Sequence, residues 1–146
     1  MIVLLSLGIA CAPHQTKTNV TVSIDSSFNS QVKLFEDLYS IPVNVSIRFV
    51  PDLGEYAAVC HEYSPNNPDN WIEVDESYWY SISDAGRDQL MLHEFGHCVL
   101  GLDHREAMGN VGGHINVPLS IMYPIAFGDN EYYRENLQYY YEELIK

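Results

Sequence analysis

The sequence predicts a single α+β domain over residues 19–146, in which a small twisted mixed sheet packs against helices. Three observations predict this class. Short segments rich in β-branched residues alternate apolar and polar positions, longer segments repeat apolar residues at helical spacing, and Pro-, Gly- and Asn-rich stretches separate them. A chain of 146 residues, 47% of them hydrophobic, supports one core and is too short for two domains.

The first half of the domain reads as strands around one helix. Residues 19–24 are β-branched and alternating, which predicts a strand. Residues 28–39 carry apolar positions at helical spacing, so they predict an amphipathic helix that packs on the sheet and ends before Pro42. Three further strands are predicted over residues 43–50, 56–63 and 71–74, with a surface loop over residues 64–70.

The second half is expected to be mainly helical. Residues 84–100 predict a helix, with Ser83 as its N-cap and Asp84 in the first turn, where the helix dipole favours an acid. Gly101 follows directly and suits a left-handed turn that reverses the chain. Residues 105–119 read as a glycine-bearing loop, and residues 129–145 predict a final helix.

The predicted helix 84–100 carries a metal-binding motif, His93-Glu94-Phe95-Gly96-His97, followed by His104. Histidines four residues apart lie on one helix face, so both imidazoles can reach a single Zn²⁺ about 2 Å away. Glu94 points to a different side of the helix and can hold the water instead of the metal. The spacing therefore predicts one catalytic zinc ion and its general base.

This stretch resembles the metzincin metallopeptidases, whose signature is H-E-x-x-H-x-x-G-x-x-H followed by a Met-turn, and it is most similar to matrix metalloproteinase catalytic domains. Gly101 and His104 each come one residue later than that pattern, so the helix is either one residue longer or bulged. The intact Gly-x-x-His half favours His104 as the third ligand. Asp103 is the alternative third ligand. It occupies the position that the third ligand would have without the extra residue, and an aspartate there resembles snapalysin-type sites.

The resemblance extends to the segment 120–124, which is similar to the Met-Tyr-Pro Met-turn. It implies that Met122 forms an apolar floor under the zinc site. Without the resemblance, Met122 would be interpreted as an ordinary core residue. The resemblance also implies a specificity pocket lined by Tyr123, Pro124 and Ala126, with Ala126 standing where the family often has a bulky tyrosine. In that family the strand equivalent to residues 57–61 is the sheet edge that pairs with an extended substrate.

The activity implied is zinc endopeptidase chemistry on protein or peptide substrates. His93, His97 and His104 would bind zinc, and Glu94 would take the proton of the attacking water and pass it to the leaving amine. Two other functions stay open. One is a zinc-binding envelope module without catalytic activity, and the other is a zinc amidase that acts on cell-wall peptides. A closed four-ligand zinc site, or two stacked core histidines, is the structural alternative.

Charge and the N-terminal segment bear on partners and location. The net charge of −13 argues against nucleic acid and anionic membrane surfaces as partners and weakly favours basic or neutral substrates. Solubility alone also explains this charge. The domain is expected to act as a monomer. Residues 1–11 resemble a signal peptide with a bacterial lipobox, in which Cys11 is lipidated, and residues 12–18 read as a tether. The protein is therefore expected to be exported, as an envelope lipoprotein or in secreted form.

The remaining cysteines and histidines carry weaker expectations. Cys60 and Cys98 either pair in a disulfide or stay as two buried thiols, and spacing does not decide between them. Three histidines lack ligand spacing to the motif: His14 falls in the tether, His61 on a strand surface, and His114 in a loop where a role at the rim of the site is open.

Overall fold

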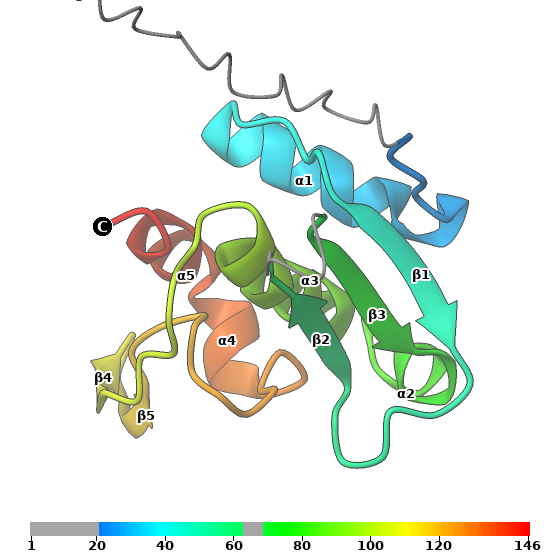
Figure 1. The fold of residues 1–146 in the computed structure, drawn as a ribbon. Helices are drawn as coiled ribbons and strands as arrows, with labels where there is room; N and C mark the ends of the chain where they lie inside the picture. Colours follow the sequence, from blue (N-terminus) through cyan, green and yellow to red (C-terminus); the bar gives the residue numbers. More distant parts are fainter. Residues whose placement is uncertain (1–20, 63–68) are drawn as a thin grey trace, which may run out of the picture.

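The computed structural model describes residues 21–62 and 69–146 and has an α+β fold with a small mixed sheet (Figure 1). The predicted signal segment, Cys11, the tether and His14 lie outside the described residues. The elements in order are η1 (Ser26–Phe28), α1 (Asn29–Tyr39), β1 (Ser46–Val50), β2 (Ala58–His61), β3 (Trp71–Asp75), α2 (Glu76–Ser81), α3 (Asp84–Cys98), β4 (Met108–Val111), β5 (His114–Pro118), α4 (Glu131–Glu135) and α5 (Leu137–Glu143).

Three of the four predicted strands form the sheet, in the order β1-β3-β2. β1 runs parallel to β3, and β2 runs antiparallel to it, so the sheet is mixed as expected. The sheet sends Ile47, Ile72 and Val74 into a core that also contains Leu92 and Phe95 of α3. β2 has no partner on its outer side among the described strands, and this free edge borders the site described below.

The predicted strand over residues 19–24 is wrong in its described part, residues 21–24. Only Ile24 pairs, through an isolated parallel bridge to Ile47 of β1. The reason is local: the Asp25 side chain accepts a hydrogen bond from the Ser27 backbone N–H and starts the turn η1, which ends any strand there. The helix predicted to follow is confirmed as α1, and Ser40 closes it in a left-handed conformation.

Three other predictions need correction. The short helix α2 was not expected; Asp75 caps it by accepting from the Tyr78 backbone N–H, and Trp79 packs into the core. The predicted loop 105–119 contains the β4–β5 hairpin, whose turn uses positive φ at Gly112 and Gly113. The single helix predicted over residues 129–145 is two helices, because Asn136 leaves helical geometry between α4 and α5.

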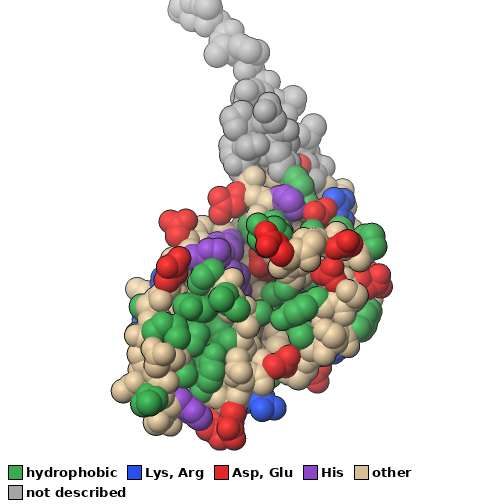
Figure 2. Space-filling view, turned by 90° about the horizontal axis from the view of Figure 1, so that it is seen from below, with side chains coloured by type: hydrophobic (Ala, Val, Ile, Leu, Met, Phe, Trp, Pro, Cys, Tyr) green, Lys and Arg blue, Asp and Glu red, His purple; other side chains and the backbone are tan. Residues whose placement is uncertain are grey.

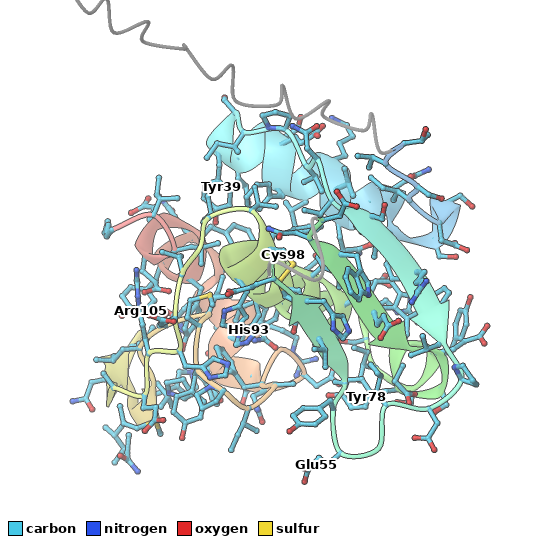
Figure 3. All side chains as sticks on the ribbon, in the orientation of Figure 1. Tyr39, Glu55, Tyr78, His93, Cys98 and Arg105 are labelled. Atoms are coloured by element: carbon cyan, nitrogen blue, oxygen red, sulfur yellow. A yellow bond between two sulfur atoms is a disulfide. The ribbon has the colours of Figure 1, made fainter. Side chains whose placement is uncertain are left out.

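A disulfide joins Cys60 of β2 to Cys98 of α3 and settles the pairing that the sequence left open. It ties the free sheet edge to the end of the helix that carries the histidines, as Figure 3 shows near Cys98. Within the described part of the chain, no helix combines the length and apolar character that crossing a bilayer requires.

Removing this disulfide is expected to lower the free energy of unfolding by about 2–4 kcal/mol, because the bond closes a loop between positions 38 apart in the sequence. The measurement is denaturant unfolding of the Cys60→Ser/Cys98→Ser variant against the oxidised protein. The unsubstituted protein in thiol reductant is the control and should match the variant. An unfolding midpoint that does not move on full reduction would contradict the prediction.

Candidate metal centre

Helix α3 carries the first half of the site because its sequence fixes both its start and its buried face. Ser83 caps it by accepting from the Gly86 backbone N–H, as predicted, and Asp84 occupies the first turn. Leu92 and Phe95 are fully buried beside the motif and hold the helix against the core. Its histidines, one turn apart, therefore face the cleft from a rigid element (Figure 3).

The end of α3 explains how a motif with one extra residue still delivers a third histidine. The Leu100 N–H donates to Phe95 O across five residues, and the Leu102 N–H donates to Gly96 O across six, so the last turn is wider than an α-helical turn. Gly101 then reverses the chain with φ at +67°. The extra residue is absorbed in this widened turn, and α3 ends at Cys98, not at residue 100 as predicted.

Three imidazoles converge beyond this turn. His93, His97 and His104 each offer a ring nitrogen within 4.8 Å of the others, and no further His, Cys, Asp or Glu of the described chain joins the group. The Nε2 atom of His93 lies 3.1 Å from Nε2 of His97 and 3.3 Å from Nε2 of His104. A tetrahedral zinc ion bound at about 2.0–2.1 Å sets its ligand nitrogens about 3.3 Å apart, which matches these separations.

The hydrogen bonds of the rings leave the triad able to hold a cation. Nδ1 of His93 donates to Ile121 O at 2.8 Å, and Nδ1 of His97 donates to Leu102 O at 2.6 Å. In a neutral ring this leaves Nε2 unprotonated, so two lone pairs face each other with no proton to share. Such an arrangement is unfavourable without a positive ion between the rings, and it is the ligand geometry that zinc requires.

The pKa values of these histidines favour the neutral, metal-binding form. Burial lowers the pKa of His93 to about 4 and outweighs the opposing hydrogen bond to Ile121 O. Burial also lowers the pKa of His97, against the opposing effect of its hydrogen bond to Leu102 O. Both rings are therefore uncharged near neutral pH, with their Nε2 lone pairs free to bind a metal.

Glu94 lies beside the triad without joining it. Its side chain is 5% exposed, and burial raises its pKa to about 7, although a hydrogen bond from the Cys60 backbone opposes the shift. A carboxyl group whose pKa lies near neutrality can both accept and release a proton at working pH. The disulfide partner Cys60 thus also connects Glu94 to the sheet edge.

Met122 packs directly under the helix that carries the motif. It is fully buried, and a Cβ placed on Gly96 would lie 2.2 Å from its Sδ atom. Gly96 is therefore small because the thioether of Met122 occupies the space of a side chain. Met122 therefore contacts the helix that carries the histidines, and its neighbours Tyr123, Pro124 and Ala126 line the cleft.

Gly96→Ala is expected to destabilise the fold by about 1–3 kcal/mol, because the added methyl group overpacks a buried site. The test is a double-mutant cycle with Met122→Ala, followed by denaturant unfolding. The double variant should lose less than the sum of the two single losses, since removing the thioether makes room for the methyl group. Strict additivity would show that Gly96 and Met122 are not in contact.

Glu143 of α5 holds the turn that orients His93, a role that the sequence did not reveal. Its Oε1 accepts from Ser120 Oγ at 2.6 Å and from the Ile121 N–H at 2.9 Å. Ile121 O in turn accepts from His93, so a chain of hydrogen bonds runs from the C-terminal helix to the triad. Arg105, which Figure 3 labels, contacts Glu143 at 3.4 Å and ties the adjacent His104 segment to the same carboxylate.

Glu143→Ala is expected to lower zinc affinity by about 10–100-fold, the usual cost of losing a group that orients a ligand. It leaves the Ser120 O–H and the Ile121 N–H without their acceptor, so stability should also fall by about 1–3 kcal/mol. Glu142→Ala is the matched control, because that side chain is 55% exposed. Equal zinc affinity in both variants, measured by chelator competition, would refute the role, whereas Glu143→Gln should recover part of the loss.

An open cleft of about 920 Å³ runs past the triad. Its walls come from residues 57–60 along β2, Tyr78 of α2, Leu90 of α3 and residues 123–126 after the Met122 turn. Glu94 and the three histidines lie within the same cleft. The arrangement can present a metal ion and a proton acceptor to a chain lying along the free edge of β2.

The other candidate residues lie outside the triad. His114 is on β5 and pairs with Glu135 at 2.8 Å, away from the cleft lining, so a role at the rim is wrong. His61 lies on the strand surface as expected, stacked on Trp71 and 2.9 Å from Glu73. Asp103 is exposed and is not among the converging groups.

No protein-family model, curated protein or solved structure matches the chain.

Proposed function

We propose that the protein is a zinc-dependent endopeptidase in which His93, His97 and His104 hold one catalytic zinc ion. The observation that carries the proposal is the set of facing Nε2 atoms, 3.1 and 3.3 Å apart, with a buried carboxyl group beside them in an open cleft. Three histidine ligands are typical of catalytic zinc sites, whereas structural sites use four protein ligands. A purely structural site would not need Glu94.

The chemistry divides between the metal and the protein side chains. Zinc, when bound, lowers the pKa of a coordinated water toward about 7 and polarises the scissile carbonyl. Glu94 would accept the proton of the attacking water and then pass it to the leaving amine. Peptide-bond cleavage by this route needs no covalent intermediate on the protein.

The free edge of β2 supports an extended polypeptide as the substrate. The strand has no described partner on its outer side and lines the cleft through residues 58–60. Main-chain pairing along such an edge satisfies the backbone groups of the substrate, while side chains enter the neighbouring pocket. We assign Tyr123, Pro124 and Ala126 to the wall of that pocket, and Leu90 and Tyr78 line the same cleft.

The Cys60–Cys98 disulfide supports an oxidising compartment, because such bonds persist outside the reducing cytosol. Export, as proposed from residues 1–11, would supply that environment. The cleft charge described below gives no support to nucleic acid as a partner.

The test combines metal content with peptide hydrolysis. Purified protein should carry one zinc ion per chain by elemental analysis, should cleave an unfolded protein substrate, and should lose activity in a chelator and regain it with zinc. His93→Ala/His97→Ala is the inactive control. Stoichiometric zinc without cleavage would favour a binding module, and cleavage restricted to peptidoglycan fragments would favour the amidase alternative. A protein that binds no transition metal would refute all three.

A further inference from the structure

Exposed carboxylates stand at both ends of the edge strand β2. Glu55 precedes the strand and Glu62 follows it; both are exposed, and both line the cleft together with Asp52. None of the three forms an ion pair with a described lysine or arginine. Figure 2 shows acidic side chains around the hollow that contains the histidines.

The basic side chains of the described chain are placed elsewhere. No lysine or arginine is among the residues that line the cleft. Arg48, Arg87 and Arg105 pair with carboxylates outside it. A cleft lined by one sign of charge focuses its electric field and raises the local concentration of oppositely charged ligands.

A second, independent feature of the cleft also indicates a ligand. Gln89 of α3 lines the cleft and is 1% exposed. Its Oε1 accepts from the Phe127 N–H at 3.2 Å, which fixes the orientation of the amide, and its amide nitrogen donates to no described residue. Because its oxygen is held by the Phe127 N–H, the amide nitrogen is the end of Gln89 left to bind a ligand that brings an oxygen. A polypeptide offers both carbonyl oxygens and cationic side chains.

We propose that the cleft selects polypeptide segments that carry lysine or arginine on both sides of the cleaved bond. This inference rests on the proposed endopeptidase function. Cys60, which lines the cleft together with Glu94, lies between Glu55 and Glu62 in the chain, so a peptide alongside β2 passes one carboxylate on each side of the reacting bond. Since strands rise about 3.3 Å per residue, the cation facing Glu62 lies about two residues from the bond and the cation facing Glu55 lies farther away.

The first experiment compares fluorogenic peptides that share one apolar centre and differ only in flanking residues, which are Lys, Gln or Glu on both sides. The Lys-flanked peptide should have a kcat/KM about five- to twentyfold above that of the Gln-flanked peptide, and the Glu-flanked peptide should be slowest. The difference should shrink as salt is raised, because exposed charges are screened.

The second experiment assigns the preference to the two carboxylates. Glu55→Gln/Glu62→Gln should bring the Lys-to-Gln ratio close to one, while Glu131→Gln, which removes an exposed acid outside the cleft, should leave the ratio unchanged. Binding of the same peptides to the Glu94→Gln variant, measured by fluorescence anisotropy, should show the same order without turnover.

The outcomes separate this inference from the proposed function. Cleavage at equal rates for all flanks, or a preference that survives Glu55→Gln/Glu62→Gln, would overturn the inference and leave the endopeptidase standing. Absence of cleavage with charge-ordered binding to the Glu94→Gln variant would support the charge selection and remove the catalytic function. Absence of both cleavage and charge-ordered binding would overturn both.

Discussion

Glu94→Gln is expected to lower peptide hydrolysis by about 10²–10⁴-fold while one zinc ion stays bound per chain. The amide has nearly the shape of the carboxyl group but cannot accept the proton of the attacking water. Glu94 is 5% exposed and hydrogen-bonded to the Cys60 backbone, so the isosteric change should leave the helix in place. It is not among the groups that converge on the metal position, so zinc affinity should not depend on it.

The measurement is kcat on a fluorogenic peptide together with zinc content by elemental analysis. Glu106→Gln, at an exposed position outside the cleft lining, serves as the control and should retain full activity. Glu94→Asp should have a kcat between those of the unsubstituted protein and Glu94→Gln, because the shorter side chain keeps a proton acceptor but places it farther from the water. Loss of zinc from Glu94→Gln would show that the Glu94 carboxylate is a zinc ligand. An undiminished kcat in Glu94→Gln would show that Glu94 takes no part in the mechanism.

The convergence of the three histidines was predictable from the sequence because its geometry is local. Two histidines four residues apart must share a helix face, and Gly101 marks the reversal that returns His104 to them. What the spacing could not decide was where the extra residue goes. The answer lies in backbone hydrogen bonds of Leu100 and Leu102 that span five and six residues, and no residue type encodes those directly.

The supporting contacts were not predictable because they join distant parts of the chain. Glu143 acts on Ile121 across 22 positions, and nothing in the final helical segment distinguishes it from the neighbouring Glu142. A close contact at Gly96 was predictable, because a glycine inside a helix usually has a packing reason. Its partner Met122 could not be inferred from the helix alone.

The errors in the fold have similar causes. The hairpin over residues 108–118 turns at Gly112-Gly113, and a Gly-Gly pair is typical of hairpin turns as well as of loops. Asn136 makes one local and one tertiary contact at the break: its side chain donates to Tyr132 O four residues earlier and occupies the space beside Gly112. Apolar periodicity in residues 129–145 continues across the break, so the pattern alone predicts one helix.

His104→Ala is expected to weaken zinc binding far more than Asp103→Ala. The first change removes a ring nitrogen 3.3 Å from Nε2 of His93, so its cost should exceed the about 10–100-fold that the loss of an outer-shell group causes. Asp103 is exposed and stands apart from the converging groups, so its removal should change zinc affinity by less than about tenfold, through the loss of a nearby negative charge.

Both substitutions fall on exposed neighbours in the same segment, so general effects on folding should be alike in the two variants and their difference reports coordination. Chelator competition gives the zinc affinities, and cobalt substitution gives an absorption spectrum that changes when a nitrogen ligand is lost. The reverse ordering would assign the third ligand to Asp103. It would also mean that zinc binding draws the widened turn after α3 back by one residue, because only then does the carboxylate reach the position that His104 now holds.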